Sequence, residues 1–301
     1  MEIRKLSDLF SAVKNKKTRR LVVVNAVDEH SLQAVHQAIS LDIVSGILTG
    51  NRDEIIRLCR EINIDPEIFT IIHAEDEQEA ALKAVKLVKE GRADIIMKGL
   101  INTDKYMRAL LNKEYGLLPP KGVLSHVTVI ENPNYHKLLI VSDVAVIPYP
   151  SLEQKIVMVN YLIDTARSLG IEHPKVALIA ASEQVLLNLV SCTDAAAIAA
   201  MNREGSFLGA VVAGPMGLDV AVDKESAEIK RIDSPVAGDA DCLLFPNIDA
   251  GNVFYKTNTK LCNSGQAAIV VGAKVPAVLS SRGDSMQIKL NSIALASILC
   301  N

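Results

Sequence analysis

Short runs of β-branched and aliphatic residues alternate with longer segments of helical spacing along most of this chain. The first run, LVVVN at residues 21–25, is followed by helical spacing from Glu29 to Ser40, and the same order then repeats. Such a repeat predicts parallel strands whose two faces are both covered by helices. We therefore expect an α/β protein with three layers: helices, a sheet, and helices.

The alternation covers the first third of the chain without interruption. Its predicted strands are residues 21–25, 42–48, 68–73 and 94–97. Its predicted helices are residues 29–40, 52–62, 76–90 and 103–112. This order is that of a βαβ series, which implies a largely parallel sheet.

The middle of the chain has a different pattern. Two strand candidates, 122–130 and 137–141, are separated by the turn-rich stretch ENPNY, which predicts a hairpin and hence a mixed sheet. The stretch IPYP at 147–150 can continue neither a helix nor a central strand. Because 301 residues correspond to roughly two domains, we place a domain crossing there.

The alternation resumes beyond this crossing. The predicted helices are 151–169, 183–202, 220–231, 249–263 and a closing helix at 285–300. The predicted strands are 175–180, 209–213, 241–245, 267–271 and 277–279. The second half therefore repeats the architecture of the first.

Charge and composition exclude several classes of protein. A net charge of −3 argues against general nucleic-acid binding, which needs a basic surface. The N-terminal segment lacks the apolar region of a signal peptide, and no apolar run approaches the roughly 20 residues of a membrane span. The five cysteines are scattered, without zinc spacing. We expect a cytoplasmic protein with reduced thiols and no metal site.

The strongest local motif is VLSSRGDS at 278–285, where a predicted strand ends and a helix begins. A helix N-terminus at the carboxyl end of a strand favours an anion. There, Arg282 can clamp a phosphate and Ser281 can donate to a developing oxyanion, while Asp284 can accept a proton. In a purely structural interpretation, Asp284 forms a capping box with Gln287 and Arg282 is a surface ion-pair partner.

Two further motifs lie at predicted strand–helix connections. In GPMGLD at 214–219, Gly214 lets the backbone approach a ligand closely. The alternative is a plain strand–helix connection in which Asp219 caps the helix. In DAGNVFYK at 249–256, the residues on neighbouring helix faces are Asn252, Tyr255 and Lys256. In a functional interpretation these residues bind a substrate. In a structural interpretation, Tyr255 is a half-buried core residue and Lys256 is a charge in contact with water.

Other candidates are isolated residues near predicted strands. Lys98 lies just beyond the strand DIIM, and Ser125 and His126 lie in the hairpin region. A lone histidine is more often structural than catalytic. Asp239 and Asp241 suggest a metal, but two carboxylates rarely suffice. There is no GxGxxG and no GxxxxGK[ST] motif for a nucleotide.

Four stretches together resemble the phosphate acetyl/butyryltransferase family. They are MKG at 97–99, SPVAGDAD at 234–241, DAGN with YKT at 249–257, and SRGDS at 281–285. Their order and spacing carry the resemblance. SPVAGDAD and the closing KLNSIALA are similar to the butyryl branch.

The resemblance implies a two-domain α/β fold like that of isopropylmalate dehydrogenases, with the active site in the interdomain cleft. Domain I is expected to comprise 1–148 plus 273–301, and domain II 149–272. The resemblance also implies a homodimer, coenzyme A as a substrate, and no required metal or redox cofactor.

The implied reaction is acyl-CoA + phosphate ⇌ CoA + acyl phosphate, by direct attack in a ternary complex. By resemblance, Arg282 matches the family's phosphate-binding arginine and Ser281 its transition-state serine, and Ser125 and Tyr255 match positions near the acyl phosphate. The acetyl branch has a key aspartate where this chain has Ile288. Asp284 is the nearest carboxylate and is assigned as the base.

Three alternatives stay open beside a butyryl or branched short-chain acyltransferase. The first is an acetyl-specific phosphotransacetylase. The second is a metal- and NAD-dependent hydroxyacid dehydrogenase on a similar fold, which would need an aspartate cluster and an NAD-binding loop. The third is a non-catalytic CoA-binding protein, for which the missing acid at Ile288 argues.

Overall fold

The computed structural model describes residues 2–14, 16–280 and 283–300. The chain divides into two compact units. Unit 1 contains the chain up to Lys5 and Ser125–Gln266, and unit 2 contains Leu6–Leu124 and the chain from Ala267 onward. The sequence predicts domain boundaries at 148/149 and 272/273, which differ from the limits of these two units. The units are defined by compactness alone, so the predicted domains stay a prediction.

Unit 2 contains parallel strands in the order β3-β2-β1-β4-β11, followed by β10, which runs antiparallel to β11. These strands are β1 (Arg19–Val24), β2 (Val44–Gly50), β3 (Thr70–His73), β4 (Ile95–Lys98), β10 (Gly265–Val271) and β11 (Ala277–Val278). The βαβ series predicted for the first third of the chain is confirmed.

The helices of unit 2, apart from the first, begin directly after a side chain that caps them. They are α1 (Asp8–Val13), α2 (Glu29–Ser40), α3 (Arg52–Glu61), α4 (Glu77–Lys89), α5 (Thr103–Leu111) and α11 (Met286–Leu299), with the short 3₁₀ helix η1 (Pro66–Ile68). The side chains of Asp28, Asn51, Asp76, Asn102 and Ser285 each accept a hydrogen bond from a backbone N–H of the first turn. Such caps satisfy N–H groups that have no partner within the helix.

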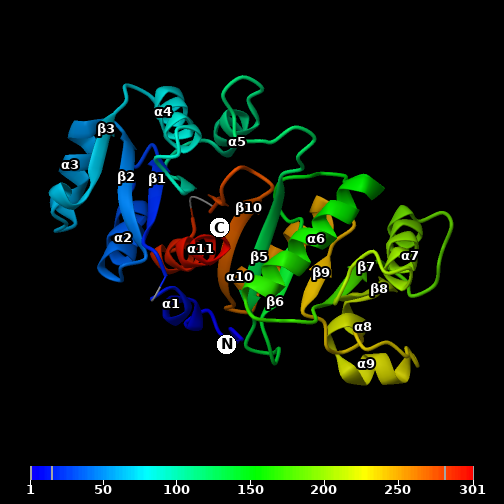
Figure 1. Ribbon diagram of the computed structural model, residues 1–301. Coiled ribbons are helices and arrows are strands. Elements are labelled where there is room, and N and C mark those ends of the chain that lie inside the picture. Colours follow the sequence, from blue (N-terminus) through cyan, green and yellow to red (C-terminus); the bar gives the residue numbers. More distant parts are fainter. Residues whose placement is uncertain (1, 15, 281–282, 301) are drawn as a thin grey trace. The chain divides into compact units, whose positions relative to one another are not determined.

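Helix α11 lies in the interior of unit 2. It packs against α2 and α1, as Figure 1 shows. Every residue from Lys289 to Ile298 is buried, including Asn291, Ser292 and Ser297. Ser292 Oγ satisfies two backbone groups, since it accepts from Ala268 N at 2.9 Å and donates to Ile288 O at 2.7 Å. A helix buried on all sides is part of the core itself.

Unit 1 combines an antiparallel hairpin with parallel strands, in the order β5-β6-β9-β7-β8. The strands are β5 (Ser125–Glu131), β6 (Leu139–Ser142), β7 (Lys175–Ile179), β8 (Val211–Met216) and β9 (Cys242–Leu244). The helices are α6 (Leu152–Ser168), α7 (Val190–Arg203), α8 (Leu218–Val222), α9 (Lys224–Ile229) and α10 (Ile248–Leu261). The predicted hairpin and mixed strand directions are confirmed.

Three predicted elements of unit 1 were wrong in detail. The helix expected over 183–202 begins only at Val190. The helix expected over 220–231 is two helices, because Asp223 is extended and caps α9 by accepting from Ser226 N. The connection expected at 214–215 is part of strand β8, which lies at the end of the strand order, where a proline removes no inner hydrogen bond.

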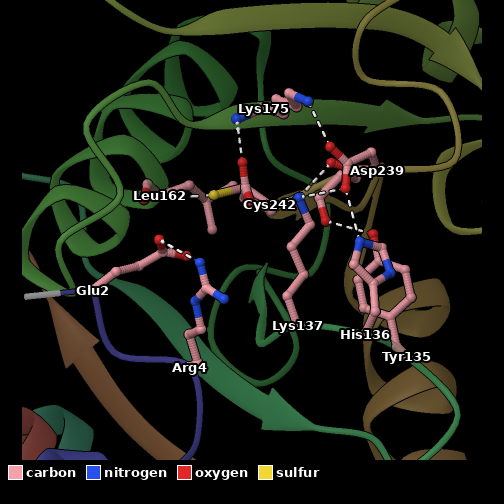
Figure 2. Close-up of polar contacts among 11 residues, drawn as sticks. Glu2, Arg4, Tyr135, His136, Lys137, Leu162, Lys175, Asp239 and Cys242 are labelled. Carbon is pink, nitrogen blue, oxygen red and sulfur yellow. Dashed lines mark hydrogen bonds and ion pairs between the residues drawn. The ribbon is translucent and has the colours of Figure 1, made fainter.

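A network of ion pairs lies before strands β6, β7 and β9 of unit 1 (Figure 2). Lys137 Nζ lies 2.8 Å from both Asp239 Oδ1 and Asp241 Oδ1. Lys175 Nζ and His136 Nε2 reach Asp239 at 2.5 Å and 2.8 Å. The two aspartates considered as metal ligands therefore serve as ion-pair partners that connect the three segments.

Among the described residues, no helix has both the length and the apolar character needed to cross a bilayer.

Candidate active site

The residues singled out from the sequence lie in both units, and each group is described within its own unit. Ser281 and Arg282 fall outside the described residues. The remaining candidates are Ser125, His126, Gly214, Asn252, Tyr255 and Lys256 in unit 1, and Lys98 and Asp284 in unit 2.

The centre of the group in unit 1 is the carboxylate of Asp143, which directly follows β6 and is 1% exposed. Its Oδ2 accepts from Ser125 Oγ at 2.9 Å and from His126 N at 3.0 Å. Its Oδ1 accepts from the backbone N–H groups of Ala145 and Val146, each at 2.8 Å. A buried carboxylate satisfied in this way fixes the start of β5 against the end of β6.

Hydrogen-bond direction fixes the state of the Ser125 hydroxyl. Ser125 Oγ donates its single proton to Asp143 Oδ2. Ser142 Oγ lies 2.8 Å from Ser125 Oγ and must then be the donor in that contact. Ser125, which is fully buried, therefore has one lone pair left and presents an acceptor.

His126 and Tyr255 form a buried aromatic pair beside this network. His126 is 3% exposed, and its Nδ1 lies 3.2 Å from Thr128 Oγ1. The rings of His126 and Tyr255 meet edge to face, with centroids 6.4 Å apart. Lys256 is exposed, and its Nζ lies 5.6 Å from the Tyr255 ring centroid, at cation–π distance. The structure thus brings together three of the candidates from β5 and α10.

Asn252 and its neighbour Gly251 hold the segment that follows Asp143. Asn252 Nδ2 donates to Val144 O at 2.9 Å. A Cβ at Gly251 would lie 2.1 Å from Asp143 O, so only glycine allows α10 to approach this closely. Asn252 therefore has a structural partner in the same segment that positions Ser125.

Gly214 lies apart from this group, on β8. A Cβ there would meet Leu178 Cβ at 2.7 Å and Leu178 O at 2.8 Å. Close contact with strand β7 accounts for this glycine, and a role in substrate binding stays a prediction. The cap expected from Asp219 is absent among the described contacts, because Gly217 is the N-cap of α8 and Asp219 pairs with Lys230.

In unit 2, Lys98 ends β4, and β11 runs parallel beside that strand, with Val278 opposite Met97. Lys98 is 2% exposed, and its Nζ lies 3.4 Å from Gly99 O. A Cβ at Gly99 would lie 2.5 Å from Asn25 O and 2.6 Å from Val24 O. The carboxyl ends of β1, β4 and β11 therefore meet closely, as the position of a ligand site in an α/β sheet requires.

Asp284 is buried, at 6% exposure, just before helix α11. The capping box considered for Asp284 with Gln287 was wrong, because the N-cap is Ser285, whose Oγ accepts from Ile288 N at 3.4 Å. The carboxylate of Asp284 is therefore not used as the cap of α11.

The sequence analysis missed a buried cation one turn into α11. Lys289 is 3% exposed, and its Nζ donates to Ser280 Oγ at 3.2 Å. Burial lowers the pKa of Lys289, and the carboxylates of Asp28 and Asp284 oppose that shift. The available signal was a lysine immediately after Ile288, at a position where the spacing of apolar residues along the helix predicts a buried side chain.

Asp143 and Ser142 were missed as well. Their signal was a polar pair directly after a predicted strand, but the partner Ser125 lies on another strand. Within the described ranges, no group of three or more histidine, cysteine or acidic side chains has the arrangement of a metal site.

Comparison with known proteins gives consistent relatives. Residues 75–297 match the family described as Phosphate acetyl/butaryl transferase. A phosphate butyryltransferase of Clostridium acetobutylicum is 43% identical over 99% of this chain and 98% of its own length. A phosphate acetyltransferase of Thermotoga maritima is 38% identical over 94% of this chain and 95% of its own length.

A solved structure supports the same grouping. The branched-chain phosphotransacylase of Enterococcus faecalis V583 matches with a TM-score of 0.82 and 31% sequence identity. The match covers 94% of this chain and 100% of that chain. The α/β fold predicted from the sequence is thus found in a relative of known structure.

Proposed function

Since the chain belongs to the phosphate acetyl/butyryltransferase family and is a phosphate acyltransferase, we propose that it transfers a butyryl or branched short-chain acyl group between CoA and inorganic phosphate. The observation that carries the choice of acyl group is the 43% identity to a phosphate butyryltransferase over nearly the whole chain. The similarity to a branched-chain phosphotransacylase supports the branched option.

In the direction of acyl-CoA formation, a base takes the proton of the CoA thiol. The thiolate attacks the acyl carbonyl carbon, the bond to the phosphate oxygen breaks, and phosphate leaves. We assign Arg282 to the phosphate, Ser281 to the developing oxyanion, and Asp284 to the base.

The proposal places the remaining candidates around the acyl and phosphate groups. Lys98, Lys256 and the aromatic pair His126–Tyr255 would contact substrate, with Asn252 and Gly214 shaping the backbone nearby. Ser125 would act there as an acceptor, because its proton is engaged by Asp143. It would therefore contact a group that carries a proton, such as a protonated phosphate or the thiol.

The test is release of CoA in the presence of inorganic phosphate, across acetyl-, propionyl-, butyryl- and isobutyryl-CoA. We expect kcat/KM to be highest for butyryl- or isobutyryl-CoA. One methylene changes discrimination by about 1–3 kcal/mol, or roughly 10- to 200-fold, so the preferred chain will be evident. Highest activity with acetyl-CoA would instead favour an acetyltransferase, the second candidate, which the 38% identity to a phosphate acetyltransferase supports.

Arg282 provides the residue-level test. Arg282→Ala should lower kcat/KM by about 100-fold or more without loss of the fold, because a charged hydrogen-bond donor to the phosphate is removed. Arg57→Ala, on the exposed face of α3, is the matched control. Full activity of Arg282→Ala would remove Arg282 from the site.

We include a cytoplasmic homodimer without a required metal in the proposal, on the strength of the family resemblance. Analytical ultracentrifugation should give twice the mass of one chain. Activity should persist in EDTA, because a cationic clamp, an oxyanion donor and a base complete the chemistry.

A further inference from the structure

Asn25, which directly follows strand β1, has an uncommon backbone conformation. Its φ of +53° lies in the left-handed region, which glycine and asparagine adopt more readily than other residue types. Its C=O accepts from Val27 N and from Leu100 N, each at 2.9 Å. The chain therefore turns directly after β1 and bonds at that point to the segment that follows β4.

The side chain of Asn25 adds a second bond to the same partner. Its Nδ2 donates to Leu100 O at 2.6 Å. We call the two hydrogen bonds, Asn25 Nδ2 to Leu100 O and Leu100 N to Asn25 O, the Asn25 clasp. Asparagine suits this place because its amide can donate and because it tolerates a positive φ. Both polar backbone groups of Leu100 are thus held by one residue.

The segment held by the clasp begins with Lys98, the last residue of β4. Gly99 N donates to Val24 O at 2.9 Å, and a Cβ at Gly99 would lie 2.5 Å from Asn25 O. Gly99 has no side chain that could lock the turn, so the bond to Val24 and the clasp do so from either side. The backbone that carries Lys98 is therefore fastened to the end of β1.

A cavity of about 260 Å³ lies beside the clasp. Its lining residues are Asp28, Glu29, His30, Gly99, Leu100 and Lys289. The clasp joins the connection that leads from β1 to α2 with the turn after β4, and both of these segments contribute to the lining. It therefore fixes the backbone at the carboxyl end of the sheet, where α/β proteins bind their ligands.

We propose that Asn25 is a positioning residue for acyl transfer, which acts through Lys98 and does not itself bind the substrate. This inference rests on the proposed function, in which Lys98 contacts the substrate. A lysine displaced by about 1 Å still attracts a phosphate but holds it in a less reactive position, because alignment of the reacting groups contributes to the rate. Loss of the clasp should thus lower kcat more than it raises KM.

The experiment uses Asn25→Gly, which removes the side-chain bond and adopts a positive φ without strain. With the preferred acyl-CoA and phosphate, we expect kcat to fall by about tenfold and the KM of each substrate to change by less than about threefold. The matched control is Asn63→Gly, the same exchange at an exposed position with a φ of +57°, and it should keep the wild-type kcat. Asn25→Asp keeps the size of the side chain but cannot donate to Leu100 O, so it should lose as much activity as Asn25→Gly.

A double-mutant cycle tests whether Asn25 acts through Lys98. Lys98→Met should lower kcat on its own, and Asn25→Gly added to it should cause no further loss, since the lysine that the clasp positions is gone. Hydrogen exchange tests the clasp independently of activity. The amide of Leu100 should exchange about tenfold faster in Asn25→Gly than in wild type or in Asn63→Gly.

The inference is overturned if Asn25→Gly keeps the wild-type kcat, if KM alone rises, or if the losses from Asn25→Gly and Lys98→Met multiply. It is also overturned if the exchange of the Leu100 amide is unchanged. A lower melting temperature with an unchanged kcat would identify a purely structural role. Failure of the proposed function gives a different result, because wild type would then release CoA from none of the acyl-CoA substrates, while the exchange of the Leu100 amide would still differ between Asn25→Gly and wild type.

Discussion

At the scale of single residues, hydrogen-bond direction decides what unit 1 offers to a substrate. Ser125 donates to Asp143 and accepts from Ser142, so it cannot also donate to a phosphate oxygen without breaking a buried bond. The carboxylate that imposes this is held by backbone N–H groups of the following segment. The buried carboxylate of Asp143 thus fixes the backbone of the segment that follows it and leaves Ser125 able only to accept a further hydrogen bond.

Asp143→Asn should destabilise the protein by about 2–4 kcal/mol. The amide can still accept from Ala145 and Val146, but its NH₂ group then faces the donors Ser125 Oγ and His126 N in a buried position. Urea unfolding measures the loss. Asp164→Asn, an exposed position on α6, serves as control and should change stability by less than about 0.5 kcal/mol. Equal stabilities of the two variants would contradict the assigned network.

Four of the residues that lie together in unit 1 were candidates from the sequence: Asn252 and Tyr255 in the motif DAGNVFYK, and Ser125 and His126 as isolated residues of the hairpin region. The residues that escaped prediction, Asp143 and Lys289, act through partners on other elements. Spacing along one element indicates which residues share a face, but it does not show which strands or loops meet there.

At the scale of elements, unit 1 contains a buried ion pair between α6 and α7. Lys155 Nζ lies 2.7 Å from Asp194 Oδ2, and their side chains are 5% and 17% exposed. The neighbouring cavity has about 10 Å³, room for at most one water molecule. Little solvent is therefore available to replace a missing partner.

Asp194→Asn should cost about 3 kcal/mol in unfolding free energy, because it leaves the Lys155 ammonium buried without its counter-charge. The double variant Lys155→Met/Asp194→Leu should recover most of this loss, since it removes both charges. Chemical denaturation of the single and double variants checks the prediction. If the double variant is less stable than Asp194→Asn, the pair itself, and not the stranded charge, dominates.

The ion-pair network before β6, β7 and β9 predicts a pH effect. Burial raises the pKa of Asp239, but hydrogen bonds from Lys137, Lys175 and His136 outweigh it and hold that pKa well below its usual range. A lowered folded pKa gives stability that is present above the unfolded pKa of about 3.9 and is lost as pH falls below it. Because the Asp239 side chain is 40% exposed, the contribution should not exceed about 1 kcal/mol.

The measurement compares wild type with Asp239→Asn at several pH values. The difference in unfolding free energy should be constant from pH 7 to about pH 5 and should shrink below about pH 4, as Asp239 of the unfolded wild-type chain takes up a proton that the folded protein does not bind. Subtraction of the variant removes the titration of other acids. A difference that stays unchanged down to pH 3 would show that this carboxylate does not titrate in the expected range.

Helices α2 and α3 begin at the predicted residues, directly after the side-chain caps Asp28 and Asn51. The predicted helix over 183–202 was too long, because its first residues have apolar spacing without burial. Val185 is 52% and Leu187 88% exposed, and α7 begins without a side-chain cap. Periodicity alone cannot distinguish such a segment from a helix that has a core to pack on.

At the scale of the whole molecule, unit 2 depends on two distant parts of the chain. Strand β11 and helix α11 come from the chain after residue 266, whereas strand β4, which pairs with β11, and helices α1 and α2, which pack against α11, lie before residue 125. The alternating pattern predicted the strands and helices of unit 2 but did not show which late strand pairs with β4. That pairing is a contact between residues about 180 positions apart, which no local pattern encodes.

Removal of residues 286–301 should therefore prevent unit 2 from folding. The deletion exposes apolar surface of α1 and α2, the helices against which α11 packs. We expect a loss of helical circular dichroism larger than 14 residues account for, and rapid proteolysis within residues 6–124. Lys86→Gln, an exposed change on α4, should leave both unaffected. Protease resistance of 6–124 in the truncated chain would contradict this dependence.

The split origin of unit 2 also has a consequence on the ribosome. Synthesis runs from the N-terminus, and domains usually fold in that order as they emerge. Here the residues of unit 1 are complete once Gln266 has left the exit tunnel, whereas the earlier-made strands of unit 2 still wait for β11 and α11. The speed of translation beyond residue 266 therefore sets how long the incomplete sheet of unit 2, with its exposed apolar surface, is accessible to chaperones.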